Sequence, residues 1–513
     1  MLRDARIVFF QSDYSPVIYS RNRMPKSFFT IDKVTSLHSL RQGASIHIIG
    51  VSGVAMAQIA VELARKGYQV TGSDKEFYEP MGGLLRASSV GLKHGYEAGN
   101  VPTNIDLVVI GNAISYENPE VAVVEEKNLP YTCFPKILEE SLISGKHSIV
   151  VTGTHGKSTT TAMIASTLVK LGTDPSYFIG GVAQDLPKSL HWGTGSYSVV
   201  EGDEYDSAFF AKVPKFEFYH PNTCIVNAIE YDHADIYPDL ESINREFTKL
   251  IIGMPASGTA LCCVDFDNTR HLVTEWKRSA TCKIITFGLD ASADVVLTER
   301  KQDGFGQLVQ VSSKQFGCFT FSIPVPGAYN AKNALATILA GLVNGLDIKK
   351  LQEAVSSFRP VKRRQEVRFN AAGVVLVEDF AHHPTAVNET IAGIREAFPD
   401  KKLWAIFEPR SNTSRRKVFQ EDYIKAFKEA DVAILCDVTA RAIDTNVELI
   451  NVAELSEKIG ATGVESACLP NAQAIEEHLM SRLSGNDVIL LMSNGSFGGL
   501  PQSLENRLHA SCT

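Results

Sequence analysis

The sequence has no Cys-x-x-Cys pair, although its 513 residues include nine cysteines. Cys262 and Cys263 are adjacent and the others are scattered along the chain. Without a paired spacing there is neither a zinc pattern nor a disulfide framework. We therefore expect reduced thiols, most of them in small core positions, in a protein of the cytosol.

The sequence also lacks a long apolar run and an excess of basic residues. No stretch approaches the roughly 20 apolar residues that a membrane helix needs. The formal net charge is −8, whereas a general nucleic-acid binder needs a basic surface that displaces counterions. We therefore expect no membrane partner and no nucleic-acid partner, while a locally basic pocket for an anion remains open.

Composition and pattern predict an α/β protein. Hydrophobic residues make up 44% and charged residues 21% of the chain, which are ordinary values for a globular protein. At ~150 residues per domain the length corresponds to about three domains. Strand and helix patterns alternate in three successive regions, at residues 44–145, 146–357 and 358–513, and this alternation predicts mostly parallel sheets.

Residues 1–43 do not share this alternation. They are rich in arginine and lysine and lack the apolar segment and cleavage site of a secretory signal. A transit peptide is the alternative, but the early acidic residues Asp4 and Asp13 disfavour it. We expect a disordered extension, or the result of an upstream start codon.

The strongest motif lies in the stretch 149–161, which reads IVVTGTHGKSTTT. A β-branched run leads into Gly153 and Gly156, Lys157 and Ser158 come next, and a helical pattern follows from Thr159 to Leu171. This order directs backbone N–H groups and the positive end of the helix dipole to one point. Lys157 adds a full charge there, and the Ser158 hydroxyl can ligate Mg²⁺. Against an ordinary strand-to-helix turn with a surface lysine, we interpret the loop as a short form of the phosphate loop that binds a nucleoside triphosphate.

The first region carries a weaker nucleotide signal. The turn Gly50-Val51-Ser52-Gly53 follows a buried strand and is a broken form of the dinucleotide motif G-x-G-x-x-G. Asp74 ends the next strand, where it could bind a ribose or a similar hydroxyl, and Asn112 follows a third strand. The alternative is a Rossmann-like scaffold in which these residues bind nothing.

Acidic residues and a histidine follow two strands of the second region. Glu201 comes directly after the strand 197–200, where a second Mg²⁺ anchor belongs in phosphate-loop enzymes. The neighbouring acids Asp203, Glu204 and Asp206 could equally form a solvated turn, so we assign the metal to Glu201. His233 in the Asp232-His233 pair follows the strand 223–226 and could contact metal or phosphate, although an exposed histidine is often just a surface residue.

Residues 290–321 are predicted to form a small antiparallel patch.

The third region has a polar segment after several of its strands. The basic cluster 361–366, VKRRQE, is either a solvated linker or charge set against a transferring phosphoryl group. The remaining segments are EDFAHHP at 378–384, EPRSNT at 408–413 and SNGSFGG at 493–499. Glycine and small polar residues allow the backbone to close on a ligand.

Taken together, these motifs resemble the Mur ligase family, which joins amino acids or peptides to UDP-N-acetylmuramate with ATP. The resemblance covers about residues 46–499 and rests on GTHGKSTT, EGDEYDSAFF, EYDHADIY, EDFAHHPTA, EPRSNT and MSNGSFGG. It implies a Rossmann-like UDP-binding domain, a central ATPase domain with a mostly parallel sheet, and a Rossmann-like C-terminal domain. Within the family the motifs are similar to the ligases that attach murein tripeptide, L-Ala-γ-D-Glu-meso-diaminopimelate, in peptidoglycan recycling.

The resemblance also implies roles for individual residues. It makes Lys157, His233 and His382 catalytic and gives Mg²⁺ the ligands Ser158, Glu201 and His233. The tripeptide would contact Arg410 and Asn412, because arginine matches carboxylates bidentately. ATP would bind Gly153, Thr154, His155, Gly156, Lys157, Ser158, Thr159, Asn330, Asn333, Arg364 and Asp379. The UDP-sugar would bind Gly50, Ser52, Gly53, Asp74 and Asn112. The carbamylated lysine of several relatives is not assigned, because the segment after the D-H motif has lysine only at Lys249.

Three alternatives accompany this interpretation. The first is the ligase that adds L-alanine to UDP-N-acetylmuramate, which shares GTHGK and the region around FAHHP. The second is an inactive nucleotide-binding relative, which the intact Lys157, Glu201 and His233 disfavour. The third is a dinucleotide-dependent oxidoreductase, which leaves the Gly153 loop unexplained. We expect a monomer or weak dimer in a bacterial cytoplasm.

Overall fold

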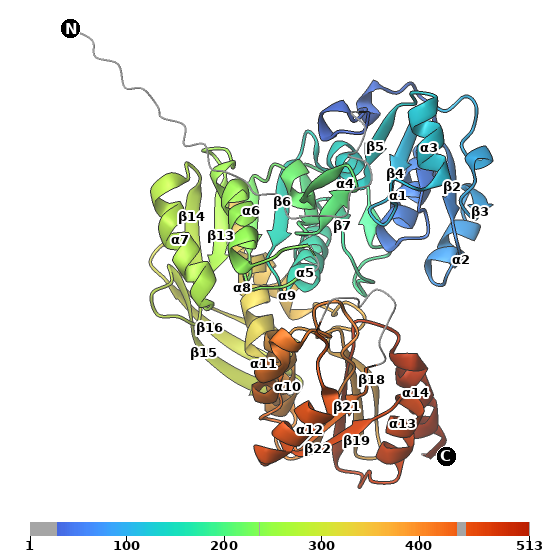
Figure 1. Ribbon diagram of the computed structural model, residues 1–513. Coiled ribbons are helices and arrows are strands. Elements are labelled where there is room, and N and C mark those ends of the chain that lie inside the picture. Colours follow the sequence, from blue (N-terminus) through green and yellow to red (C-terminus); the bar gives the residue numbers. More distant parts are fainter. Residues whose placement is uncertain (1–27, 235, 439–447, 512–513) are drawn as a thin grey trace, which may run out of the picture.

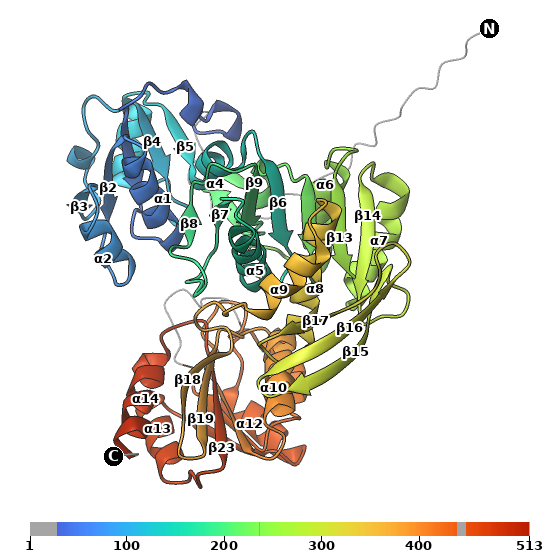
Figure 2. The same cartoon turned by 180° about the vertical axis from the view of Figure 1, so that it is seen from behind.

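The protein folds into three α/β domains that follow one another along the chain (Figure 1). The computed structural model describes residues 28–234, 236–438 and 448–511. The view from behind (Figure 2) shows the first and central domains side by side, with the C-terminal domain below them. The expected α/β class with mostly parallel sheets is confirmed.

The first domain is a five-stranded parallel sheet in the order β3-β2-β1-β4-β5. Its central strands read as nearly continuous apolar runs because helices and the neighbouring domain bury both faces. The order reverses at β1, so the carboxyl ends of β1 and β4 border a crevice of the kind in which ligands bind. The strands are β1 (Ser45–Ile49), β2 (Gln69–Asp74), β3 (Gly91–His94), β4 (Leu107–Ile110) and β5 (Tyr131–Cys133). The helices are α1 (Val54–Arg65), α2 (Met81–Arg86), α3 (Pro119–Glu126), α4 (Phe134–Leu138), η3 (Ala98–Asn100) and η4 (Glu139–Ile143).

Residues 28–43 correct the expectation of a disordered extension over 1–43. They contain the short helices η1 (Ile31–Lys33) and η2 (Leu37–Ser39) and pack on the first domain. Phe29 is 3% exposed, with its ring centroid 4.9 Å from that of Tyr131 and 5.3 Å from that of Phe209. The backbone N–H of Thr30 donates to the Tyr131 hydroxyl at 2.7 Å. Burial of aromatic surface holds this segment in place, and the many basic residues of 1–43 gave no indication of it. Residues 1–27 lie outside the described part of the chain.

The central domain is built on a ten-stranded sheet in the order β17-β16-β15-β14-β13-β12-β6-β9-β7-β8. The neighbouring strands from β7 through β9, β6, β12, β13 and β14 to β15 pair in parallel. The strands β15, β16 and β17 pair antiparallel with one another at one edge, and β8 pairs antiparallel with β7 at the other. The predicted antiparallel patch is therefore part of the main sheet. The strands are β6 (His147–Thr152), β7 (Ser176–Phe178), β8 (Leu190–His191), β9 (Tyr197–Glu201), β12 (Thr223–Val226), β13 (Thr259–Cys263), β14 (Lys283–Gly288), β15 (Val295–Asp303), β16 (Gly306–Ser313) and β17 (Gly317–Ile323).

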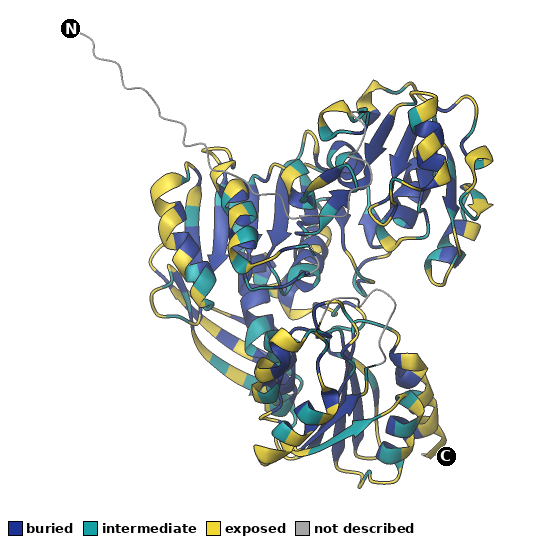
Figure 3. Ribbon diagram, in the orientation of Figure 1, coloured by how far each residue is buried: buried dark blue, intermediate teal, exposed yellow. Residues whose placement is uncertain are grey.

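Helices cover both faces of this sheet. One face packs against α5 (Lys157–Lys170), α8 (Ala328–Val343) and α9 (Ile348–Ser356), and the other against α6 (Leu240–Ile252) and α7 (Asp267–Ser279). A short hairpin of β10 (Asp206–Ala208) and β11 (Ala211–Pro214) precedes η5 (Lys215–Phe218). Figure 3 shows the central strands of the sheet buried between these layers, while β15 and β16 alternate buried and exposed residues.

The C-terminal domain has a six-stranded sheet in the order β18-β19-β23-β20-β21-β22, parallel except for β18. The strands are β18 (Glu366–Ala371), β19 (Val374–Asp379), β20 (Lys402–Phe407), β21 (Val432–Cys436), β22 (Glu465–Leu469) and β23 (Asp487–Met492). One face packs against α10 (Pro384–Ala397), α11 (Gln420–Ala426) and α12 (Val452–Ala461), with η6 (Lys417–Phe419) preceding α11. The other face packs against α13 (Ala472–Met480) and α14 (Leu500–Ser511), with η7 (Phe497–Gly499) leading into α14.

The C-terminal domain meets the central domain along α10 and in the loops that follow its strands. Arg300 on β15 pairs bidentately with Glu396 on α10, at 2.8 and 2.9 Å. The backbone N–H of His233 donates to the Thr413 hydroxyl at 3.2 Å. Among the described residues, no helix is both long and apolar enough to span a bilayer.

Candidate active site

The phosphate-loop prediction coincides with a loop whose glycines are sterically required. The loop connects β6 to α5, and β6 lies between β12 and β9, where the strand order reverses. Gly153 has φ of 112°, and a Cβ there would lie 2.7 Å from the Ala228 carbonyl oxygen. Gly156 has φ of 79°, and a Cβ there would lie 2.7 Å from Asn333 Oδ1. These two positions accept only glycine without distortion, which opens the N-terminus of α5 to an anion.

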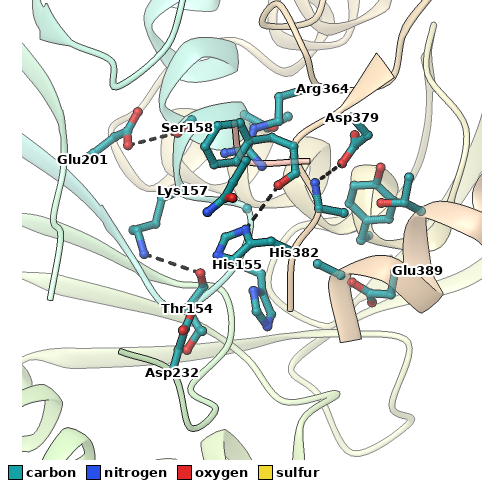
Figure 4. Close-up of a pocket in the computed structure, with 18 of the residues that line it drawn as sticks. Thr154, His155, Lys157, Ser158, Glu201, Asp232, Arg364, Asp379, His382 and Glu389 are labelled. Carbon is teal, nitrogen blue, oxygen red and sulfur yellow. Dashed lines mark hydrogen bonds between the residues drawn. The ribbon is translucent and has the colours of Figure 1, made fainter. Parts of the chain in front are cut away.

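A cavity of about 300 Å³ lies at this N-terminus, between the central and C-terminal domains. Figure 4 shows Lys157, Ser158 and Glu201 on one side of the cavity and Arg364, Asp379 and His382 on the other. The predicted site residues that line it are Thr154, His155, Gly156, Lys157, Ser158, Thr159, Glu201, His233, Asn330, Arg364, Asp379 and His382. Tertiary structure therefore brings separate segments of the central and C-terminal regions to one space.

Ser158 and Glu201 form the pair that the sequence predicts for Mg²⁺. The Ser158 hydroxyl donates to Glu201 Oε2 at 3.0 Å, and the Gly180 N–H donates to the other carboxylate oxygen at 2.6 Å. Burial raises the pKa of Glu201, which a bound cation would reverse. Hydroxyl and carboxylate oxygens are the hard donors that Mg²⁺ prefers, so the donor set fits this ion.

His233 and Lys157 share a carboxylate that the sequence interpretation left unassigned. Glu204 Oε1 lies 2.9 Å from His233 Nε2, and Glu204 Oε2 lies 2.8 Å from Lys157 Nζ. Burial opposes ionisation of Glu204, but the charges of Lys157 and His233 keep its pKa below the usual value. The same contact raises the pKa of His233 against the effect of burial.

Asp203, Glu204 and His233 have ligand atoms within 4.8 Å of one another. The Nδ1 atom of His233 is buried and has no hydrogen-bond partner in the described part of the chain. This trio is a second set of donors that fits a divalent cation. Glu204 follows a strand end by only three residues, and its place in that acidic turn is the signal that could have identified it.

The predicted nucleotide residues of α8 and of the C-terminal domain surround the loop. The Asn330 amide donates to the Gln365 side chain at 2.8 Å, while Asn333 Nδ2 is buried without a partner among the described residues. The Arg364 guanidinium lies 4.7 Å from the centre of the Phe380 ring. Asp379 accepts backbone N–H groups from Gln365 at 2.8 Å and Ala381 at 2.7 Å. Asp379 thus fixes the loop that presents Arg364 and His382.

His382 projects from the loop after β19 toward Asp232 and the phosphate loop (Figure 4). Burial lowers the pKa of His382 to about 4, so the imidazole is neutral at pH 7. Its Nδ1 lies 3.2 Å from the Phe380 carbonyl oxygen, which only accepts, so Nδ1 carries the proton. The other ring nitrogen, Nε2, then offers a lone pair.

In the first domain Asp74 binds its own chain. Its Oδ2 accepts the Ser52 N–H at 2.8 Å and its Oδ1 accepts the Tyr96 hydroxyl at 3.1 Å. These bonds fix the turn Gly50–Gly53 at the end of β1. Asn112 lines a second cavity, of about 230 Å³, together with Gly180, Glu201 and Asp203 of the central domain. The first domain thus reaches the metal-ligand candidates through Asn112.

The segments EPRSNT and SNGSFGG meet at the ends of β20 and β23. The Arg410 guanidinium donates to the Ser496 hydroxyl at 3.4 Å. The Arg410 side chain covers Gly495, where a Cβ would lie 2.2 Å from Arg410 Cδ. Ser411, Thr413 and Asn494 of these segments line the 300 Å³ cavity, while Arg410 and Asn412 are exposed.

The two arginines of the basic cluster 361–366 have different surroundings. Arg364 faces the cavity, whereas Arg363 is held by the Glu378 carboxylate at 2.7 Å and the Ser493 carbonyl at 2.8 Å. Lys249 pairs with Glu246 on the outer surface of α6, away from the cavity, which agrees with leaving it unassigned. Tyr329 and Glu389 also line the cavity, and no local motif distinguishes either residue in the sequence.

Comparison with known proteins shows family models matching each domain. The Mur ligase family catalytic domain matches residues 45–144, the Mur ligase middle domain residues 151–341, and the Mur ligase glutamate ligase domain residues 363–495. The chain belongs to the Mur ligase family. As a Mur ligase it is an ATP-dependent ligase, and the expected enzyme class and family are confirmed.

Its relatives in this family carry two different names. The chain is 32% identical over 471 residues to UDP-N-acetylmuramate–L-alanyl-γ-D-glutamyl-meso-2,6-diaminoheptandioate ligase of Haemophilus influenzae, covering 90% of this chain and 99% of the relative. It is 33% identical over 454 residues to UDP-N-acetylmuramate–L-alanine ligase of Pelobacter propionicus, covering 88% and 95%. A crystal structure of a murein peptide ligase from Psychrobacter arcticus matches with a TM-score of 0.65 and 30% identity, covering 91% of this chain and 99% of that chain.

Proposed function

We propose that this Mur ligase joins murein tripeptide to UDP-N-acetylmuramate in a bacterial cytoplasm. ATP phosphorylates the lactyl carboxylate of the sugar nucleotide, which gives an acyl phosphate and ADP. The free amine of the peptide attacks the acyl carbon, and the tetrahedral intermediate expels inorganic phosphate to leave an amide. The observation that carries the peptide assignment is Arg410, which lies over Gly495 beside the cavity.

The phosphate loop and its neighbours account for the first step. The N–H groups at the start of α5 and the charge of Lys157 bind the triphosphate, and Asn330, Asn333 and Arg364 surround the nucleotide. Ser158 and Glu201 would hold one Mg²⁺, and His233 with Glu204 and Asp203 would hold a second cation. Bound Mg²⁺ would neutralise charge on the phosphates. Neutral His382 accepts a hydrogen bond beside the transferring group without adding charge.

The sugar nucleotide, which carries the lactyl carboxylate, would approach the active site from the side of the first domain. The cavity between Asn112 and Glu201 supports a path by which the lactyl group of the sugar nucleotide approaches the metal ligands. The turn Gly50–Gly53, fixed by Asp74, would hold the uridine diphosphate end. The positively charged guanidinium of Arg410 would bind a carboxylate of the incoming peptide on the opposite side.

An acceptor assay tests the proposal. Purified protein with UDP-N-acetylmuramate, ATP and Mg²⁺ receives either the tripeptide or L-alanine, and phosphate release and product mass are measured. We expect kcat/KM for the tripeptide to exceed that for alanine by about 100-fold, a difference of about 2.7 kcal/mol. A preference for free alanine would overturn the tripeptide assignment and leave the family assignment intact.

The alanine-adding reaction is the second candidate. It is favoured by the relatives named UDP-N-acetylmuramate–L-alanine ligase, which match at similar identity. The two candidates differ in the size of the acceptor, so the same assay separates them.

A further inference from the structure

A third group of metal-ligand side chains lies next to the active-site cavity and mostly outside its lining. It consists of His155 from the phosphate loop, Glu230 from the loop after β12, and His383 at the N-cap of α10. One ring nitrogen of each histidine and one carboxylate oxygen of Glu230 lie within 4.8 Å of one another. Three separate segments, one of them in the C-terminal domain, therefore place donors at one point.

The hydrogen bonds of His383 prepare this residue for a ligand. Its Nε2 lies 3.2 Å from the Tyr231 carbonyl oxygen, which only accepts, so Nε2 carries the proton. Nδ1 is then the lone-pair nitrogen, and it receives only a long contact of 3.4 Å from the Thr385 N–H. Metal-binding histidines are typically fixed in this way, by donating the other N–H to a carbonyl.

Glu230 is also held in place by a neighbour. Its Oε1 accepts the Thr385 hydroxyl at 2.9 Å, and its Oε2 lies 2.9 Å from His155 Nε2. The rings of His155 and His383 have centroids 4.6 Å apart. Two imidazoles and one carboxylate are the donor set of zinc sites that keep a fourth position for water or another ligand, whereas Mg²⁺ prefers oxygen donors throughout.

We propose that His155, Glu230 and His383 form a zinc-type site that joins the phosphate loop to the C-terminal domain. Glu230 and His383 lie outside the lining of the 300 Å³ cavity, and only His155 borders it. The site is therefore separate from the two donor sets assigned to the reaction. A bound ion holds α10, and with it the His382 loop, against the phosphate loop.

Cobalt spectroscopy of the full-length protein tests the site independently of ligase activity. The protein is stripped with EDTA, placed in excess Mg²⁺ to fill the oxygen-rich sites, and titrated with Co²⁺. We expect the intense visible absorption of a tetrahedral Co²⁺ site that saturates at about one equivalent and is displaced by Zn²⁺. We also expect Zn²⁺ to raise the Tm, because it binds the folded state.

Variants assign the signal to these residues. His383→Ala and Glu230→Gln should abolish the absorption. Circular dichroism checks that each variant is folded, and His155→Asn, with the same expected loss, replaces a variant that is not. His191→Ala is the matched control, because His191 pairs with Asp174 at 2.8 Å outside the cluster, and it retains the signal. Weak octahedral absorption only, a signal lost in His233→Ala instead, or a signal that persists without His383 would each overturn the proposal.

Discussion

Glu204 holds Lys157 through both carboxylate oxygens, at 2.8 and 3.0 Å, where Lys157 lines the active-site cavity. The phosphate-loop lysine is thus paired with an acid that also contacts His233 at 2.9 Å. Burial opposes the charge of Lys157, but Glu204 and Asp203 raise its pKa. The lysine therefore stays protonated, and a triphosphate must compete with Glu204 for it.

Glu204→Gln should separate nucleotide binding from turnover. The amide keeps the shape but removes the charge that pairs with Lys157, so ADP should bind more tightly without Mg²⁺. Loss of the negative charge beside His233 should lower kcat by about 10- to 100-fold. Calorimetry and phosphate release measure the two effects. Asp206→Asn, in the same segment but paired with Lys212 at the surface, should change neither, and an unaltered kcat for Glu204→Gln would contradict its role.

Lys157→Ala should abolish most of the activity. Removing the positive charge next to the transferring phosphoryl group should lower kcat/KM for ATP by about 1,000-fold, which corresponds to about 4 kcal/mol. Lys249→Ala, which removes an exposed lysine of α6, is the control and should behave as the wild type. Equal rates of phosphate release in both variants would show that the loop does not bind ATP.

Arg410→Ala should weaken binding of the peptide and leave ATP unaffected. A charge-assisted bond to a carboxylate contributes about 1.5–3 kcal/mol, so KM for the tripeptide should rise by roughly 10-fold or more. Arg410→Lys should recover part of the loss, because it keeps the charge and loses the bidentate geometry. Steady-state kinetics with Arg278→Ala as a surface control checks this. A fall in kcat with an unchanged KM would argue against peptide binding.

Asn112→Ala should raise KM for UDP-N-acetylmuramate. Asn112 shares the 230 Å³ cavity with Glu201, and loss of one neutral hydrogen bond, worth about 1 kcal/mol, should raise this KM about 5-fold. The KM values for ATP and for the peptide should stay the same. Asn104→Ala, at an exposed position of the same domain, is the control, and a change in the KM for ATP would place Asn112 in a different site.

The stability of the protein should fall as the pH drops from about 6.5 to about 4. Burial lowers the pKa of His382 to about 4 in the folded state, while the unfolded chain has a value of about 6.5. Between these values the unfolded state binds a proton that the folded state does not, so the free energy of unfolding decreases with falling pH.

His382→Asn should flatten this dependence by up to about 3 kcal/mol. Urea unfolding at a series of pH values in EDTA measures it. The difference in the free energy of unfolding between variant and wild type at pH 7.5 is the reference, because His382 is neutral at this pH in both the folded and the unfolded protein. The same slope in wild type and variant would show that His382 does not titrate in this way.

Local sequence determined most of the elements and the chemistry of the phosphate loop. The strand predicted at 223–226 has these bounds in the structure, and the strand predicted to end at Asp74 does end there, because apolar runs between turn residues indicate burial on both faces of a parallel sheet. The helix predicted from Thr159 to Leu171 begins two residues earlier, at Lys157. Gly153 and Gly156 could also be recognised from the sequence, because a phosphate loop needs glycine where its backbone takes a positive φ.

The partners of the charged side chains were decided only by the tertiary structure. The acidic turn 203–206 marks a group of candidate residues, but only the structure selects Glu204 among them, because Lys157 and His233 are brought to it from two other strand ends. Phe29 likewise packs against Tyr131 of the first domain and Phe209 of the central domain, which are more than 100 residues away in the chain. Hydrophobic periodicity is a property of neighbouring residues, so the sequence alone determined the three α/β domains and the triphosphate loop. The pairing of buried charges depends on distances set by domain packing, and it was therefore the tertiary structure that decided which acids and histidines share a site.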